Sequence, residues 1–181
     1  NSPSNGLVRD SAIQVDDNVW HHVAFTYNGT SLGSGINIYI DGNLSNGPVG
    51  RDNLSASILN DVPLNIGTIP GTSIAFNGLI DDVRIYNRAL SGQEVQVLYR
   101  SVEMITVSMQ ARYTFEEGVG TIATDSSGNN RNGTITGATW TTGKNGGGLN
   151  FDGNDYVTIP RMNYDEISVS AWFNKNTSGT N

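Results

Sequence analysis

The chain has 181 residues, of which 77 are Asn, Gly, Ser or Thr and only 15% are charged. This composition excludes a helical bundle or a coiled coil, because both need Ala, Leu, Glu and Lys in quantity. The net charge of −7, with only two lysines, excludes the clustered positive charge that nucleic-acid binding requires. Cysteine is absent, which excludes disulfides and thiolate metal sites.

The first half of the chain contains short runs in which apolar and polar residues alternate, as they do in β-strands. Strands are predicted at 19–27, 36–40, 64–66, 75–79 and 82–86. Asn-Gly and Asp-Gly pairs follow the first two runs and have the conformational freedom that a tight turn requires. One short helix is predicted near 91–99, because Ser91 and Glu94 have the spacing of a capping box.

The β pattern resumes after a connecting segment at 101–110, which could itself pair as an edge strand. Strands are predicted at 112–115, 133–135, 148–151, 156–159 and 167–173. Short strands separated by about 8–12 residues, with turn residues between them, are typical of sandwiches and jelly rolls. The sequence therefore predicts an all-β fold, a two-sheet antiparallel sandwich of the jelly-roll type.

Specific strings in both halves carry a family resemblance. The first half contains Trp-His-His-Val-Ala-Phe-Thr-Tyr at 20–27, Ile-Tyr-Ile-Asp-Gly at 38–42 and Gly-Leu-Ile-Asp-Asp-Val-Arg-Ile-Tyr-Asn-Arg-Ala-Leu-Ser at 78–91. The second half contains Tyr-Thr-Phe-Glu-Glu at 113–117, Asp-Ser-Ser-Gly at 125–128, Gly-Leu-Asn-Phe-Asp-Gly-Asn-Asp-Tyr-Val at 148–157 and Ser-Val-Ser-Ala-Trp-Phe at 168–173. Together they resemble LamG-like jelly-roll domains of the concanavalin A-like lectin and glucanase superfamily.

The resemblance implies an inverted order. Residues 1–100 resemble the family's C-terminal half and residues 111–181 its N-terminal half, with 101–110 as a connector. In one interpretation the chain is a circular permutant that forms one domain, since the ends of a compact domain often lie close together. In the other, the halves come from successive repeats and are completed by strand exchange, which predicts self-association through incomplete sandwich edges. The resemblance also implies that a strand pair is missing between the two chain ends.

Catalysis is not expected. Glycoside hydrolysis needs two carboxyl groups on either side of the scissile bond, and the five glutamates include no Glu-x-Asp-x-x-Glu spacing. Adjacent Glu116 and Glu117 would point to opposite faces of a strand and cannot form such a pair. The adjacent histidines, His21 and His22, lack the further ligands that a zinc site requires. One of them is expected to pack against Trp20 or a loop and the other to be exposed.

A structural calcium ion is the predicted cofactor, because similar domains often carry one and the acidic loops offer oxygen ligands. The main candidate ligands are Glu116, Glu117, Asp125, Asp81 and Asp82. A second candidate is the loop 152–155. The alternative is that these residues only form turns, or that Arg84 pairs with one of the acids.

Sugar binding needs an aromatic platform with planar polar groups beside it. Trp20 and Trp172 stand at strand positions that point to the core of similar domains. Trp140 and Tyr164 lie in polar stretches and are the candidate platforms, with Asn154 and Asp155 as candidate polar ligands. The alternative for both aromatics is core packing.

The sequence thus predicts a non-catalytic carbohydrate-binding or adhesion module of a larger bacterial surface or secreted protein, with a glycan or polysaccharide as partner. A structural spacer repeat without a ligand and a remnant of a polysaccharide-degrading enzyme are the alternatives. Membrane insertion is not expected, because no apolar run approaches the roughly 20 residues of a membrane span.

Overall fold

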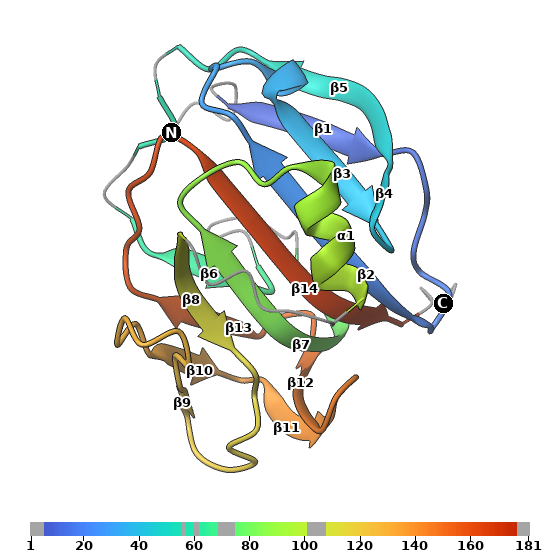
Figure 1. Ribbon diagram of the computed structural model, residues 1–181. Coiled ribbons are helices and arrows are strands. Elements are labelled where there is room, and N and C mark those ends of the chain that lie inside the picture. Colours follow the sequence, from blue (N-terminus) through green and yellow to red (C-terminus); the bar gives the residue numbers. More distant parts are fainter. Residues whose placement is uncertain (1–5, 56, 60–61, 69–74, 101–107, 177–181) are drawn as a thin grey trace.

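The computed structural model describes residues 6–55, 57–59, 62–68, 75–100 and 108–176, whose path is drawn in Figure 1. The strands are β1 (Leu7–Ser11), β2 (Trp20–Tyr27), β3 (Ile36–Ile40), β4 (Asn43–Leu44), β5 (Asn46–Asp52), β6 (Leu64–Ile66), β7 (Asn77–Tyr86), β8 (Met109–Tyr113), β9 (Ile122–Ala123), β10 (Gly133–Thr136), β11 (Thr139–Thr142), β12 (Gly147–Asp152), β13 (Tyr156–Ile159) and β14 (Ile167–Lys175). A turn of 3-10 helix, η1 (Gly33–Gly35), and a helix, α1 (Gly92–Arg100), accompany them. The prediction of an all-β sandwich with one short helix is confirmed.

The largest sheet has eight antiparallel strands and forms the centre of the molecule. Its order is β11-β12-β7-β14-β2-β3-β4, and β8 also pairs with β7. β7 has room for two neighbours on one side because β12 pairs with its first part, 77–80, and β8 pairs with its last part, 83–86. The long strands β7 and β14 therefore connect most of the sheet.

Two smaller sheets make up the second layer. One has the order β6-β13-β10-β9, and the other is the pair β1-β5. The sequence predicted two sheets, and the pair β1-β5 is an addition to that prediction. β1 and β5 were missed because both strands are partly polar and their side chains are half-buried or exposed.

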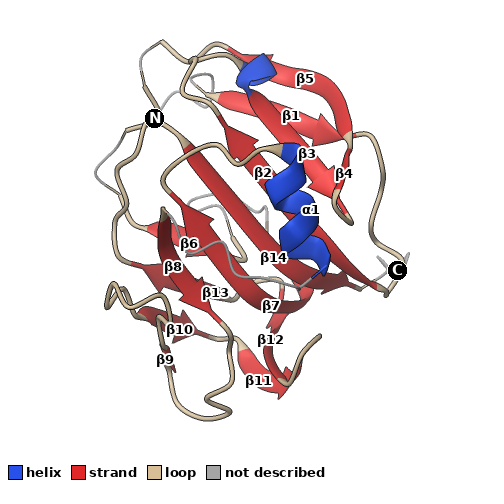
Figure 2. Cartoon of the chain, in the orientation of Figure 1, coloured by secondary structure: helices blue, strands red, loops and turns tan. Residues whose placement is uncertain are grey.

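Side chains on the two faces of the large sheet form two separate cores. The inner core faces the smaller sheets and includes Val83, Ile85, Tyr113, Phe151 and Ile159. On the outer face, Val95 and Leu98 of α1 pack with Ala24, Tyr86 and Met109. Figure 2 shows α1 crossing over β2 and β14 on this face. The helix thus seals one face of the sheet.

Strands from the two segments of the chain, 6–100 and 108–176, alternate in the large sheet. β14 lies between β2 and β7, with Trp172 opposite His22 and Ser168 opposite Tyr86. β8 pairs with the end of β7. One chain therefore places both segments in one sandwich. The origin of the inverted order and the permutant interpretation stay predictions.

Three expectations about strand limits need correction. The runs 75–79 and 82–86 are one strand, β7, which bends at Asp82, where φ is 47°. The strand predicted at 112–115 is β8, which begins earlier, at Met109, within the connector that the sequence allowed to pair as a strand. Residues 101–107 of that connector lie outside the described residues. The strand β11, at 139–142, was not predicted, because its Thr-rich sequence has a single large apolar side chain.

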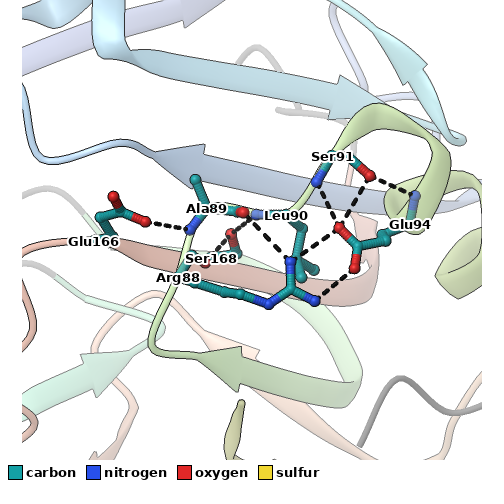
Figure 3. Close-up of polar contacts among 7 residues, drawn as sticks. All are labelled: Arg88, Ala89, Leu90, Ser91, Glu94, Glu166 and Ser168. Atoms are coloured by element: carbon teal, nitrogen blue, oxygen red, sulfur yellow. Dashed lines mark hydrogen bonds and ion pairs between the residues drawn. The ribbon is translucent and has the colours of Figure 1, made fainter. Parts of the chain in front are cut away.

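The start of α1 confirms the predicted capping box and shows what fastens it. The Ser91 amide donates to Oε2 of Glu94 at 2.8 Å, and the Glu94 amide donates to Oγ of Ser91 at 3.3 Å. Arg88 forms an ion pair with the same glutamate, and the Leu90 amide donates to Oγ of Ser168 on β14, as Figure 3 shows. The helix is thereby positioned by a strand that lies about 80 residues later in the chain.

Candidate functional site

Asp82, a predicted calcium ligand, is engaged by two arginines. Its carboxylate oxygens lie 2.5 Å from Nη2 of Arg84 and 3.0 Å from Nε of Arg112. Burial raises the pKa of Asp82, but the hydrogen bonds and charges of Arg84 and Arg112 outweigh burial and hold this pKa below its usual value. The pairing of Arg84 with an acid was one of the predicted alternatives and is confirmed. Asp82 therefore acts as the centre of a buried ion-pair network.

Asp125 is engaged by backbone amides. Its carboxylate accepts hydrogen bonds from the amides of Arg112, Ser127 and Arg131, at 2.9 to 3.0 Å. Burial acts to raise its pKa, but these hydrogen bonds prevail and lower it. Glu117 lies beside this loop and accepts from the Thr124 amide at 2.6 Å. Both side chains thus order the loop that follows β8.

Asp81 and Glu116 meet at a different place, the turn that joins β11 to β12. Oδ2 of Asp81 accepts from the Asn145 amide at 2.9 Å, and Oε2 of Glu116 accepts from the Gly147 amide at 3.0 Å. Asp81 is 1% exposed, and its Oδ1 has no hydrogen-bond partner. Burial raises the pKa of Asp81 to about 6. Among the described residues of the predicted set, Oε2 of Glu117 is also buried without a hydrogen-bond partner, but Glu117 as a whole is only half-buried.

The five predicted calcium ligands are therefore distributed over three places. Asp82 lies among arginines, Asp125 and Glu117 lie in the loop after β8, and Asp81 and Glu116 lie at the turn 143–147. Within the described ranges no group of three or more His, Asp or Glu side chains has the arrangement of a metal site. The set as predicted does not supply the six to eight oxygens that calcium prefers. Calcium binding stays a prediction. Of the five candidate ligands, Asp81 and Glu116 both contact the turn 143–147 and are the pair considered below.

Two of the four predicted sugar ligands stabilise a turn. Oδ2 of Asp155 accepts from the Asp152 amide at 2.9 Å, which closes the β12–β13 turn, and Asn154 is exposed at its tip. A Cβ atom on Gly137 would lie 1.9 Å from Oδ1 of Asp155, so Gly137 is needed beside it. The second loop considered for calcium, 152–155, is this same turn. These contacts agree with the turn-forming alternative.

The two candidate aromatic platforms differ in their surroundings. Trp140 on β11 packs against the inner core, and its indole Nε1 donates to the Gly120 carbonyl oxygen at 2.9 Å. Tyr164 is half-buried in the loop before β14, and its Oη donates to Oε1 of Gln110 at 2.5 Å. The two aromatics have no hydrogen-bond partner in common. Tyr164 is the one that lies beside a planar amide.

Further polar groups lie around Tyr164. Nη2 of Arg131 is 3.5 Å from Oε1 of Gln110, the atom that accepts from Tyr164. Nδ2 of Asn129 donates to the backbone carbonyl oxygen of Gln110 at 3.2 Å and to the backbone carbonyl oxygen of Met109 at 3.1 Å. We call Tyr164, Gln110, Arg131 and Asn129 the Tyr164 cluster. It combines an aromatic ring with amide and guanidinium groups, which is the chemistry that sugar recognition requires.

The sequence pointed to Tyr164 but missed its partners. Gln110 was assigned to the connector, and Arg131 and Asn129 lie in a stretch of turn-forming residues. They meet Tyr164 because β8 and the loop 125–131 are held together by the hydrogen bonds of Asp125. The contact between Gln110 and Tyr164 spans 54 residues, so no local spacing in the sequence signals it.

The two histidines differ in burial, but the expectation that one of them is exposed is wrong, because the His21 side chain is only 17% exposed. His22 is 2% exposed and packs against Trp172, with ring centroids 5.4 Å apart, rather than against Trp20. Trp172 is buried, as predicted, whereas Trp20 is half-buried. His21 is not free on the surface, because Nδ1 lies 2.8 Å from Asp41 and Nε2 lies 3.2 Å from Asp17.

Comparison with known proteins identifies the family. The family model described as the concanavalin A-like lectin/glucanases superfamily matches residues 2–96, which is more than half of the chain. The chain belongs to this superfamily. Its predicted resemblance and its β-sandwich fold are thus confirmed, while the inverted order of the two halves stays a prediction.

A curated mouse protein is also similar in sequence to this chain. Its name is "Sushi, von Willebrand factor type A, EGF and pentraxin domain-containing protein 1", and it is 32% identical over 93 residues. The match covers 48% of this chain and 3% of the mouse protein, so the chain spans a small part of that relative. No solved structure gives a significant match. In the described residues, no helix combines the length and apolar character needed to cross a membrane.

Proposed function

We propose that the chain is a non-catalytic carbohydrate-binding module of a larger extracellular or cell-surface protein, and that the Tyr164 cluster contacts the sugar. The observation that carries the proposal is the convergence of Tyr164 and Arg131 on one oxygen of Gln110. Sugars offer both apolar ring faces and hydroxyl groups, and such a cluster presents an aromatic face with planar donors and acceptors beside it. Membership of a lectin and glucanase superfamily supports the same class of ligand.

The assignment to a larger extracellular protein rests on the relative. The mouse protein is much longer than the match and its name specifies several domain types, so a similar segment there is one part of a multidomain chain. A bacterial source was predicted from the sequence and stays a prediction. Adhesion through a bound glycan is the role that we infer from these two points.

A glycan array tests the proposal with three variants. We expect Tyr164→Ala to abolish binding and Tyr164→Phe to weaken it, because Phe keeps the ring but loses the hydrogen bond to Gln110. Tyr156→Ala, on β13, is the matched control and should bind like the unmodified chain. The proposal fails if the folded chain binds no glycan, a result that would support the spacer alternative. It also fails if Tyr164→Ala binds glycans as well as the unmodified chain does.

A structural calcium ion is a second proposal, which one observation favours. Oδ1 of Asp81 is buried without a partner beside a turn that Glu116 also contacts. A cation at this position would satisfy the unpaired oxygen. We expect calcium to raise the melting temperature of the unmodified chain and to leave that of Asp81→Asn unchanged. An equal response of both proteins, or no response of either, contradicts this proposal.

A further inference from the structure

The second layer of the sandwich is divided, and the strands described in it leave part of the large sheet uncovered. β6 is the last strand of its sheet, and β1 pairs only with β5 among the described strands. Two cavities lie on the inner face of the large sheet, with volumes of about 490 and 460 Å³. Leu64 and Ile66 of β6 line the first cavity, and Leu7 of β1 lines the second. Phe25 lines both, so the two cavities are neighbours, and we call them together the inter-sheet groove.

The floor of the inter-sheet groove is apolar. It consists of inward-facing side chains of β2 and β14, with Phe25 directly opposite Val169 in the register and Ala171 and Phe173 farther along. Phe25 is 39% exposed although it stands on the face that carries the inner core. Large apolar side chains on this face are normally covered, since burial of apolar surface stabilises the fold. The groove therefore has the character of an unfilled core position.

The rims of the groove offer backbone hydrogen-bonding groups. Leu64, Asn65 and Ile66 pair with β13 along one edge, and no described strand pairs with their other edge. Oδ1 of Asn65 is also buried without a hydrogen-bond partner. Unpaired strand edges beside an apolar face accept an added strand, whose backbone supplies hydrogen bonds and whose alternate side chains fill the groove. An apolar small molecule would leave these polar groups unsatisfied.

One charge distinguishes the two ends of the groove. Lys175, the last residue of β14, is the one charged side chain that lines the first cavity, whereas the chain as a whole carries a net charge of −7. Its nearest acid, Asp16, is 3.9 Å away, which is a weak ion pair at a partly exposed position. An acidic group on the occupant would lie favourably at this end.

We infer that the inter-sheet groove binds an extended strand of a partner polypeptide, with alternating apolar side chains and an acidic residue at the end that meets Lys175. A strand of about five to seven residues spans roughly 16–23 Å, at about 3.3 Å per residue. This interaction is independent of the Tyr164 cluster, which is built from other residues. It gives the module a protein-binding surface in addition to its proposed sugar site.

Fluorescence anisotropy with synthetic peptides tests the inference. The probe is a labelled peptide, Glu-Val-Thr-Val-Thr-Val-Thr, and the control peptide replaces each Val by Ser. We expect the probe to bind and the control peptide not to bind. Phe25→Ser should weaken binding about tenfold or more, because it removes the side chain at the centre of the floor. Val119→Ser, an exposed apolar residue outside the groove, should have no effect.

Hydrogen exchange provides a second measurement that needs no variant. The probe peptide should slow exchange of amides in Leu64–Ile66, whereas an occupant that only fills the cavity would not. Absence of peptide binding overturns the inference. Light scattering that shows a stable dimer, in which a second copy fills the groove, also overturns it. So does binding of an apolar dye without any binding of the peptide, since the groove is then a small-molecule site.

Discussion

Asp82 of β7 and Arg112 of β8 form an ion pair of 3.0 Å that joins the two segments of the chain. The segments are separated in the sequence by residues 101–107, and their strands alternate in the large sheet. Asp82 also pairs with Arg84 on its own strand, so one carboxylate neutralises charges from both segments. Asp82 has a φ of 47°, and its carboxylate contacts both guanidinium groups.

Asp82→Asn is therefore expected to destabilise the fold strongly. The asparagine removes the counter-ion of the buried Arg84, and removal of one partner of a buried pair costs about 3–5 kcal/mol. The measurement is the free energy of unfolding from a urea titration. Asp16→Asn is the control, because its pair with Lys175 is long and partly exposed, and its loss should be at most about 1 kcal/mol. Equal losses in the two variants would refute the role given to Asp82.

Ser168→Ala tests the second connection between the segments. Ser168 is 1% exposed, and its Oγ accepts from the Leu90 amide at 2.9 Å and donates to the Arg88 carbonyl oxygen at 2.8 Å. The alanine variant leaves these buried groups unsatisfied, which costs roughly 1–3 kcal/mol. Ser170→Ala, also buried on β14, serves as the control. A loss no larger than that of Ser170→Ala would show that the link does not fasten the start of α1.

Asp81 gives a prediction about pH. Its pKa is raised by burial to about 6, so the folded state binds more protons than the unfolded state between pH 3.8 and about 6. In chelator, stability should therefore fall as the pH rises through this window. Asp81→Asn should flatten this dependence and be more stable than the unmodified chain at pH 7.5, by on the order of 2 kcal/mol. A variant with an unchanged pH profile would contradict the buried, unsatisfied state of Asp81.

The adjacent histidines should titrate in opposite directions. Burial lowers the pKa of His21, but hydrogen bonds with Asp41 and Asp17 outweigh burial and raise it above 6.5. The stabilisation of the fold by His21 is complete below pH 6.5 and is lost as the pH rises through the raised pKa of His21. Burial and the charge of Arg84 lower the pKa of His22 to about 4, so its contribution is complete above pH 6.5 and is lost as the pH falls toward 4.

NMR titration of the two imidazoles checks these directions. His21→Gln should destabilise the chain more at pH 5.5 than at pH 8.5, because its ion pairs exist only while the imidazole is protonated. His22→Gln should remove part of the loss of stability below pH 6.5. Two histidines with the same direction of shift would be inconsistent with the packing of β2.

The sequence predicted the parts of the fold that depend on local pattern. Alternation located β2 and β3, and the Ser91–Glu94 spacing located the start of α1. The division of β7 into two runs was wrong because Asp81-Asp82 resembles a break. Tertiary contacts with Arg84, Arg112 and the turn 143–147 make these acids part of a buried strand.

The candidate site was predictable only in part. Tyr164 was selected because it stands in the polar loop 161–166, and its hydroxyl group donates to Oε1 of Gln110. The grouping of the acids was not predictable, since hydrogen bonds with arginines and backbone amides, rather than spacing, decide where each one lies. Gln110 and Arg131 carry no local signal, because their position depends on the pairing of β8 with β7.

The central claim, that the Tyr164 cluster is a sugar-binding site, is tested most directly by amide chemical-shift mapping. The isotope-labelled chain is titrated with a glycan that is positive on the array. We expect the largest shift changes at Gln110, Asn129, Arg131 and Tyr164, with little change in β3 and β4. Binding with the largest changes elsewhere, for example around Trp140 and the turn at 152–155, would contradict it.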